Sequence, residues 1–422
     1  MSALDSTTQT QEARIRDLEE RLGSALAEVE SVRQGLPLDG EQIAKEARRR
    51  FLHFIVDRVN PGYQERHRGD LSSWNQELWK EAGQLGLIGF NAPAEIGGEG
   101  RDTGSWNITL EELGKLTEDP GFLIIIVVNK IWANLIHSQG NARLVERFAR
   151  PMISGDLSLA WAVWEPADLS FMQSVARKVD SGWILSADKP MLTGGQYAGV
   201  FAVAVRDEAT SEPILFLVER TDPGVKCTPL PTVGGHHIGY ASLKLKDTFV
   251  PEDRLLLATD AISAVSPRFD FGALDALAVH LGWMQRTVSL CVSSLRSKVR
   301  AGMTVLSIPH VQAELGRLFM GVELARAMFL RTLERGRQHD SATESLVVIL
   351  KHFLTESALD TGRTVMGLQG ASGYMDENPW GRYWTHAICL LHAAGAQDLL
   401  PQQLGERMLV ELEMKKLRKV GF

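Results

Sequence analysis

Cysteine and histidine are the first residues to examine for chemistry, because their side chains bind metals and act as nucleophiles or bases. The three cysteines, Cys227, Cys291 and Cys389, lie far apart and form no C-x-x-C motif. Their spacing indicates neither a disulfide framework nor a zinc site, and it fits a reducing cytoplasm. His236 and His237 are adjacent, so in an extended chain they point to opposite faces and cannot easily ligate one metal. We therefore predict a structural role for these two histidines and no metal site.

Nucleotide-binding and zinc-protease motifs are absent from the sequence. No G-x-G-x-x-G follows an expected strand, and neither G-x-x-x-x-G-K-[ST] nor H-E-x-x-H occurs. Rossmann, P-loop and zincin chemistry are therefore unsupported. With 45 Lys and Arg against 52 Asp and Glu, the net charge of −7 gives no general attraction for nucleic acid or for an anionic membrane. We expect neither as a partner.

The size and composition of the chain fit a globular protein. It has 422 residues, of which 44% are hydrophobic and 23% charged, enough to bury one or two substantial cores. The longest apolar run, 122–128, is much shorter than the roughly 20 residues that span a bilayer. The N-terminus shows no basic-then-apolar signal pattern. These features predict a cytoplasmic protein without a membrane segment.

The first part of the chain has helical periodicity. Residues 1–38 form an extension whose apolar positions from Ile15 to Leu36 predict an amphipathic helix, packed either on its own subunit or in a short coiled coil. An N-terminal helical domain is expected over 39–154. Its predicted helices cover residues 41–60, 73–85, 105–117 and 122–139.

The period then changes from 3.6 residues to 2 and back again. A middle domain over 155–265 contains β-rich segments at 158–164, 183–192, 200–205, 214–218 and 243–250. The short connections between them predict an antiparallel sandwich or barrel. After Pro267 the helical period returns, which predicts a C-terminal helical bundle over 266–422. The expected fold class is therefore α+β.

Several short motifs, in this order along the chain, resemble those of the acyl-CoA dehydrogenase family. The matching segments are Leu85-Gly86-Leu87-Ile88-Gly89 followed by Pro93 and Gly97-Gly98, Glu111-Glu112-Leu113-Gly114, Glu165-Pro166, Lys189 to Gly195, Phe249-Val250-Pro251, Gly370-Ala371-Ser372-Gly373-Tyr374, and Arg382-Tyr383. Each match is weak alone, but their shared order from residue 39 to the end supports the family's three-domain fold.

The resemblance implies an FAD cofactor whose ring lies between the β domain and the C-terminal helices. Thr193 matches the family threonine that hydrogen-bonds near flavin N5. Trp164 stands at the position that faces the flavin pyrimidine edge, where the family usually has a small hydroxyl residue. The resemblance also implies an acyl thioester substrate, carried by CoA or by an acyl carrier protein.

The family's FAD pyrophosphate and adenine reach a neighbouring subunit, which implies a homodimer or homotetramer. Lys298 and Arg300 fall in the stretch where a family arginine holds this pyrophosphate. Gly370 and Gly373 belong to the matching glycine-rich loop. The glutamine that the family places three residues before this loop is replaced by Gly367.

Both usual positions of the family's catalytic base lack a carboxylate. In many members a glutamate removes the α-proton of the thioester; it precedes a glycine about twelve residues after the Arg-Tyr pair. The matching residue here is Ala394. Other members carry the glutamate on the first helix after the β domain, where Gly272 stands in this sequence. The resemblance therefore implies an atypical base.

Four other side chains are candidates for this base. His392 and Asp398 flank Ala394, His280 lies on the first C-terminal helix, and Glu165 ends the first strand of the β domain. Histidine has a pKa suited to general-base chemistry near pH 7, so His392 is the first choice.

Three functions remain open from the sequence. The first is an FAD-dependent oxidoreductase similar to acyl-CoA dehydrogenases, with an unusual base. The second is a flavin-dependent monooxygenase on the same scaffold, because oxygen activation needs no α-proton base. The third is a non-catalytic subunit that pairs with an active homologue.

Overall fold

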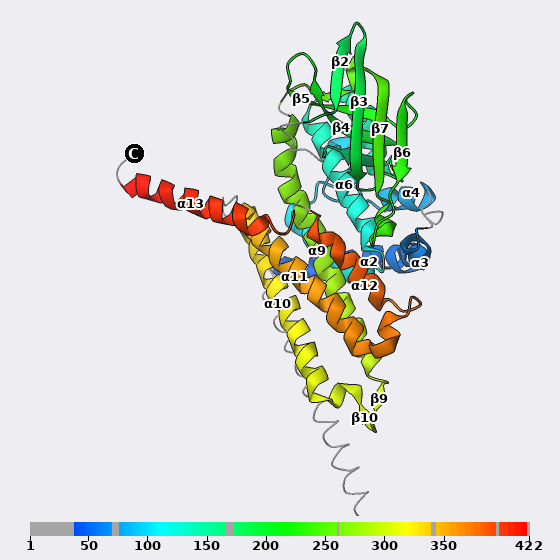
Figure 1. The fold of residues 1–422 in the computed structure, drawn as a ribbon, viewed down its shortest axis with the longest axis vertical. Coiled ribbons are helices and arrows are strands. Elements are labelled where there is room, and N and C mark those ends of the chain that lie inside the picture. Colours follow the sequence, from blue (N-terminus) through cyan, green and yellow to red (C-terminus); the bar gives the residue numbers. More distant parts are fainter. Residues whose placement is uncertain are drawn as a thin grey trace, which may run out of the picture.

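A computed structural model describes residues 38–69, 76–165, 172–259, 261–338, 343–393 and 396–419. The amphipathic helix expected before residue 38, and Ala394 with its neighbour Gly395, lie outside the described residues. Two helical regions enclose a central sheet, so the predicted α+β class is confirmed (Figure 1).

The N-terminal region is helical, as predicted. Its α-helices are α2 (Leu38–His53), α3 (Tyr63–His67), α4 (Gln76–Gln84), α5 (Thr103–Leu116), α6 (Pro120–Ser138), α7 (Ala142–Leu144) and α8 (Arg150–Ser154). A π-helical segment, Phe54–Val59, continues α2 toward the end of the helix expected at 41–60. Aspartate side chains cap the two longest buried helices: Asp102 accepts a hydrogen bond from Ser105 N, and Asp119 accepts one from Phe122 N.

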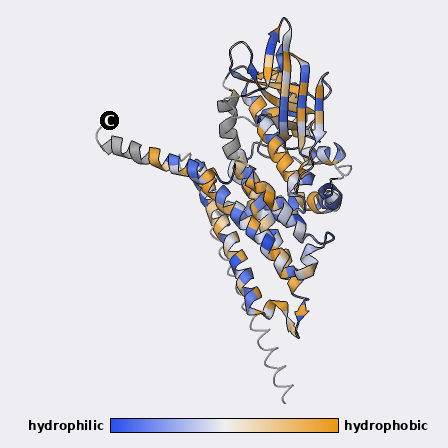
Figure 2. Ribbon diagram, in the orientation of Figure 1, coloured by the Kyte–Doolittle hydropathy of each residue, from blue (hydrophilic) through white to orange (hydrophobic). Residues whose placement is uncertain are grey.

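Helix α6 is long and apolar enough to cross a membrane by length and composition alone. In its most apolar window, however, 67% is buried inside the protein. It packs against β1, α8 and α9, and Figure 2 shows it as a largely apolar helix beside the sheet. A helix that is apolar on most sides is expected in the core of a large protein, so this single helix is weak evidence for a membrane span.

The central sheet has eight strands. They are β1 (Leu159–Ala162), β2 (Val175–Val179), β3 (Gly182–Leu192), β4 (Val200–Asp207), β5 (Pro213–Glu219), β6 (Val225–Pro229), β7 (Ala241–Pro251) and β8 (Leu255–Leu257). Their order is β6-β7-β3-β2-β4-β5-β8, and β1 also pairs with β4. The expectation of a purely antiparallel sheet was wrong, because β1 and β2 both run parallel to β4. The two strands share its length: β1 pairs from Val200 to Val203, and β2 pairs at Arg206 and Asp207.

The C-terminal region returns to helices. They are α9 (Ala261–Leu295), α10 (Pro309–Arg337), α11 (Thr343–Gln369), α12 (Trp380–Ile388) and α13 (Leu400–Lys419), with a hairpin of β9 (Val299–Arg300) and β10 (Met303–Thr304) between α9 and α10. Helix α9 begins at Ala261, so Pro267 falls inside the helix and does not precede it. Helices α9, α10, α11 and α12 pack together, whereas α13 projects away from them (Figure 1).

Two glycines allow α5 and α9 to cross closely. A Cβ atom on Gly282 would overlap the carbonyl oxygen of Glu111, and one on Gly114 would overlap that of Val279. Both obstacles are backbone atoms, which cannot rotate away. We expect Gly282→Ala to lower the free energy of unfolding by about 1–3 kcal/mol through overpacking, measured by urea denaturation.

Gly316 provides the matched control, since no atom lies within 4 Å of a Cβ built at that position of α10. Gly316→Ala is expected to raise stability by up to about 1 kcal/mol, because alanine favours helix over glycine. Equal effects of the two substitutions would show that the α5–α9 contact is not closely packed.

Candidate functional site

The four candidate bases occupy very different environments. His392 and Asp398 are exposed, beside the undescribed residues 394–395. His280 is buried on α9. The side chain of Glu165 is buried at the end of β1, 2.6 Å from the ammonium of Lys189. The structure therefore does not bring the four candidates together.

Glu165 is held in a structural ion pair. Besides Lys189, its carboxylate accepts hydrogen bonds from the backbone N–H groups of Gln173 and Ser174 at 2.7 and 3.2 Å. Burial raises the pKa of Glu165, but the hydrogen bonds from Lys189 and Ser174 outweigh this effect and leave the pKa below its usual value. A carboxylate stabilised in this way is a weak base, so the geometry disfavours Glu165 in that role.

The second family position for a glutamate has no free space. A Cβ built on Gly272 would lie 2.5 Å from Cδ1 of Ile131, a side chain of α6. A longer side chain could enter only if Ile131 moved. The absence of a carboxylate at this position is therefore matched by the packing around it.

His280 belongs to a cluster of histidines that the sequence did not reveal. Its Nε2 lies 3.0 Å from Nε2 of His386 on α12, and its Nδ1 lies 2.7 Å from the carbonyl oxygen of Ala276. The two imidazole rings are nearly parallel, with an interplanar angle of 13°. On its other side His386 stacks on His237, with ring centroids 4.9 Å apart. Three elements distant in sequence thus meet through their imidazoles.

The clustered imidazoles are neutral at ordinary pH. Burial lowers the pKa of His280 to about 4, and it lowers that of His237 to about 4 although the Asp119 carboxylate favours the charged form. Burial, followed by repulsion from His237 and His280, lowers the pKa of His386 further. Each ring therefore keeps one unprotonated nitrogen, which can accept a hydrogen bond or bind a metal.

Several ring nitrogens of this cluster have no hydrogen-bond partner within the part of the chain that the structure describes. They are Nδ1 of His67, Nδ1 and Nε2 of His237, and Nδ1 of His386. Buried polar atoms in folded proteins are nearly always paired with protein, water or an ion. Four such atoms in one cluster therefore need a chemical explanation.

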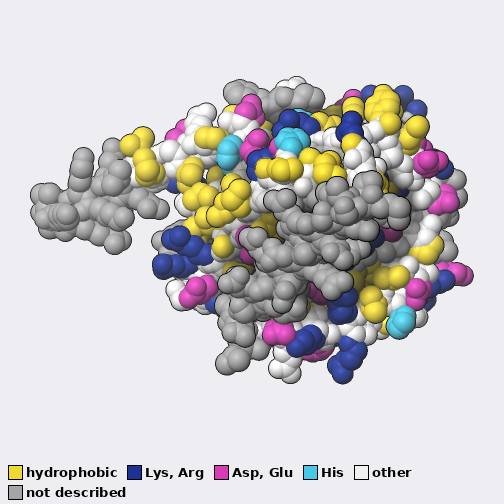
Figure 3. All heavy atoms as spheres, turned by 90° about the horizontal axis from the view of Figure 1, so that it is seen from below, with side chains coloured by type: hydrophobic (Ala, Val, Ile, Leu, Met, Phe, Trp, Pro, Cys, Tyr) yellow, Lys and Arg dark blue, Asp and Glu magenta, His cyan; other side chains and the backbone are white. Residues whose placement is uncertain are grey.

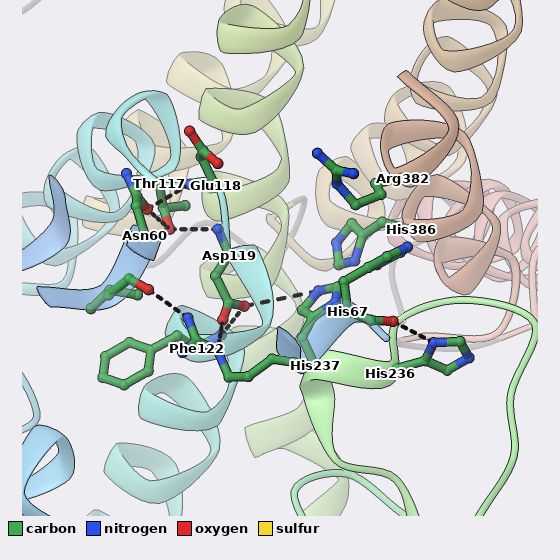
Figure 4. A network of polar contacts seen from close by, with 12 residues as sticks. Asn60, His67, Thr117, Glu118, Asp119, Phe122, His236, His237, Arg382 and His386 are labelled. Carbon is green, nitrogen blue, oxygen red and sulfur yellow. Dashed lines mark hydrogen bonds and ion pairs between the residues drawn. The ribbon is translucent and has the colours of Figure 1, made fainter. Parts of the chain in front are cut away.

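A buried ion pair anchors the cluster to the N-terminal helices (Figure 4). Arg66 on α3 donates from Nε to Asp119 Oδ2 at 2.6 Å, and both side chains are fully buried. The other carboxylate oxygen of Asp119 lies 4.0 Å from Nε2 of His237 and also caps α6. Asp119 therefore connects α3, α6 and the loop that carries His237.

The loop between β6 and β7 fits tightly between the two helical regions. Its short 3-10 segment, His236–Ile238, places His237 against Gly121 at the start of α6. On the opposite side, a Cβ on Gly234 would overlap the carbonyl oxygen of Thr385 in α12. The structural role predicted for His237 is thus accompanied by a close contact between loop and helices.

The residues expected near a flavin ring lie where β1 and β3 end. Trp164 and Met191 each expose 47% of their surface there, and Thr193, which follows β3, is partly buried. The next residue, Gly194, has φ +72°, which lets the chain turn sharply. An exposed apolar surface beside a hydroxyl group suits one face and one polar edge of a planar aromatic cofactor, so these residues fit a flavin ring.

The residues expected at the pyrophosphate form a second group. Lys298 donates from Nζ to Oε1 of Gln369 at 2.5 Å and to Oγ of Ser372 at 3.1 Å. The structure thus brings Lys298 to the loop that carries Gly370 and Gly373, while the Arg300 side chain is exposed on β9. Gln369, two residues after the expected glutamine position, already engages the lysine, a contact that the alignment missed.

The chain is similar to known proteins over most of its length. Residues 41–156 match the model of the acyl-CoA dehydrogenase N-terminal domain, and residues 262–409 match that of the C-terminal domain. A probable acyl-CoA dehydrogenase of Bacillus subtilis (strain 168), YngJ, is 25% identical over 74% of this chain and 84% of its own length.

Solved structures share the fold at lower sequence identity. The prolyl acyl carrier protein oxidase AnaB has a TM-score of 0.80 at 18% identity, covering 89% of this chain and 100% of that one. The FAD complex of PigA also has a TM-score of 0.80 at 18% identity, covering 89% of this chain and 99% of that one. Identities this low establish the common fold.

Proposed function

Because this chain belongs to the acyl-CoA dehydrogenase family, we propose that it is an FAD-dependent oxidoreductase that acts on an acyl thioester carried by CoA or by an acyl carrier protein. The observation that carries the proposal is the match of both helical domains in one chain, together with residues at the ends of β1 and β3 that fit a flavin ring. Solved structures with this fold include an acyl carrier protein oxidase, which supports the wider substrate class.

Trp164, Met191 and Thr193 would hold the flavin ring, and Lys298 with Arg300 would approach the phosphates. Bound FAD supplies the acceptor for the hydride that leaves the acyl chain. Lys298 is already hydrogen-bonded to Gln369 and Ser372, so it would have to share its donors with a phosphate. Arg300 is exposed and carries a permanent charge, which makes it the better phosphate ligand of the two.

The base in this proposal is not a glutamate. His280 already shares its Nε2 with His386, and Glu165 is bound by Lys189. His392 is exposed and lies two residues from Ala394, so it remains the first candidate to take the α-proton. Asp398, which is also exposed, is the second.

We expect the purified protein to bind about one FAD per chain, measured by flavin absorbance of the released cofactor. Removal of one aromatic contact by Trp164→Ala should weaken FAD binding by roughly 2- to 10-fold, the effect of about 0.5–1.5 kcal/mol. Val233 is 80% exposed in the β6–β7 loop, and Val233→Ala is the control that should leave affinity unchanged. No flavin uptake by the wild type would favour the non-catalytic subunit.

Reduction of the bound flavin without oxygen separates the two enzymatic alternatives. A dehydrogenase or oxidase should be reduced directly by its acyl thioester, whereas a monooxygenase should need a separate reductant. The panel should present the same acyl groups on CoA and on an acyl carrier protein, because the sequence does not distinguish the two carriers. Flavin that stays oxidised with every thioester, yet reacts with oxygen once reduced, would support the monooxygenase.

The assembly in this proposal is at least a homodimer. Phe319, Met320 and Leu324 are exposed together on α10, at 42%, 58% and 59% of their surface. Exposed apolar groups of this size often mark a contact between subunits. Light scattering of the FAD-loaded protein would measure the mass, and a value of one 46.6 kDa chain would contradict the dimer.

A further inference from the structure

Two histidines and a cysteine meet in the interior of the C-terminal helices. One donor atom each from His280, His386 and Cys389 forms a group in which all three atoms lie within 4.8 Å of one another. His386 and Cys389 are three residues apart, where α12 passes into the short 3-10 segment Cys389–Leu391, and so share one side of the helix. His280 comes from α9, on the other side of the group.

The distances suit a single metal ion. Zinc bonds to nitrogen and sulfur are about 2.0–2.3 Å long, so donors of one tetrahedral site stand about 3.3–3.8 Å apart. Nε2 of His280 and Nε2 of His386 are already 3.0 Å apart. Cys389 needs to approach by about 1 Å or less to complete this spacing.

The chemical state of the donors is also suitable. Metals bind neutral imidazole, and burial keeps both histidines neutral. Nδ1 of His280 faces the carbonyl oxygen of Ala276, which fixes the proton on that nitrogen and leaves a lone pair on Nε2. A metal-bound histidine characteristically makes such a hydrogen bond through its other nitrogen.

We propose that His280, His386 and Cys389 form a zinc-binding site. Binding breaks the S–H bond of Cys389, forms a bond between Sγ and zinc, and releases one proton to the solvent. The two imidazoles contribute lone pairs without losing a proton. Three protein ligands leave one coordination position of a tetrahedral ion for water. Nitrogen and sulfur donors favour zinc over the hard cations magnesium and calcium.

Two features of the interior bear on the thiol. Burial raises the pKa of Cys389 to about 12, so the free thiol is protonated at neutral pH. The nearby ammonium of Lys351 acts in the opposite direction and favours the thiolate. Burial lowers the pKa of Lys351 itself to about 8, so part of the population loses its charge near that pH and repels a metal ion less.

The inference is independent of the proposed flavin chemistry. The two remaining explanations of the unpartnered nitrogen atoms are buried water and a simple hydrogen bond between His280 and His386. Neither of these predicts binding of a metal, nor a role for the Cys389 thiol. A direct measurement of zinc therefore separates them from the proposal.

The test uses the full-length protein with its flavin. The protein is treated with a chelator, exposed to zinc chloride, freed of excess metal by gel filtration and analysed for zinc by mass spectrometry. We expect about one zinc ion per chain in the wild type. Cys389→Ser should weaken zinc binding by more than about 100-fold, because loss of an outer-shell partner alone costs up to that much.

Cys227→Ser is the matched control, since Cys227 is a partly buried thiol in the distant strand β6 and its replacement should leave the zinc content at one. Zinc at background level in the wild type, or equal in the wild type and Cys389→Ser, would overturn the proposal. Equal binding would assign the metal to another site, such as the FAD phosphates.

A second measurement on the wild type does not depend on a variant that folds. Calorimetric titration with zinc in buffers of different ionisation enthalpy counts the protons released. The proposal predicts about one proton per zinc ion at neutral pH, from the Cys389 thiol. Binding without proton release would also overturn it, because a protonated thiol is not a zinc ligand.

Discussion

An Ala394→Glu variant is expected to reduce its flavin with straight-chain acyl-CoA substrates about 10²- to 10⁴-fold faster than the wild type, the usual contribution of a positioned general base. The substitution places a carboxylate at the position where many relatives carry their catalytic glutamate. In its absence the α-proton of a thioester is too weak an acid to leave quickly. Stopped-flow absorbance without oxygen measures the rate of flavin reduction directly.

Gly272→Glu is the informative counterpart, because it restores a carboxylate at the family's other position. Ile131 lies where the new side chain would begin, so this variant is expected to gain no activity and to lose stability. Wild-type turnover of simple acyl-CoAs on the order of 10 per second, a typical enzyme rate, would show that the base is already in place. Slower reduction after His392→Ala would then identify it.

Asp119→Ala is expected to lower the free energy of unfolding by about 3–5 kcal/mol, the range observed when one partner of a buried ion pair is removed. The substitution leaves the Arg66 guanidinium buried without its carboxylate. It also removes the side-chain cap of α6, which alone contributes about 1 kcal/mol. Urea denaturation followed by circular dichroism would measure the loss.

The matched control for this ion pair is Glu252→Ala. Glu252 pairs with Lys178 at 3.0 Å, but both side chains are more than half exposed. Exposed pairs contribute about 0–1 kcal/mol, so the control should change stability little. Asp119→Asn divides the two effects, because the amide oxygen can still cap α6 while the negative charge is lost. A loss below about 1 kcal/mol in Asp119→Ala would contradict the assigned role.

Local periodicity predicts much of this fold, because each helix and strand of the core buries one face or alternates its side chains. The helix expected at 105–117 is found at Thr103–Leu116, and the strand expected at 183–192 is Gly182–Leu192. Strand β6 was missed, because it is short and none of its residues is fully buried, so its pattern is weak. The parallel pairing of β1 and β2 with β4 depends on contacts distant in sequence, which periodicity does not encode.

The site was less predictable than the fold. The alignment located Thr193, Trp164 and Lys298, because they stand in or beside recognisable short motifs. The meeting of His280, His386 and Cys389 depends on how α9 packs against α12, so cysteine spacing alone predicted no metal site. A weak signal existed in the spacing His386-x-x-Cys389 on a predicted helix, which sets two metal-binding side chains on one face.

The contact of the β6–β7 loop with α6 and α12 limits how the protein can move. Gly121 and Gly234 have no free space above them, so His237 cannot slide past either helix without breaking a close contact. A hinge motion of the sheet against the helices would have to withdraw the whole loop and expose the buried Arg66–Asp119 pair. Entry and exit of a bound molecule must therefore use smaller rearrangements elsewhere, and the sheet and both helical regions should respond to strain as one rigid unit.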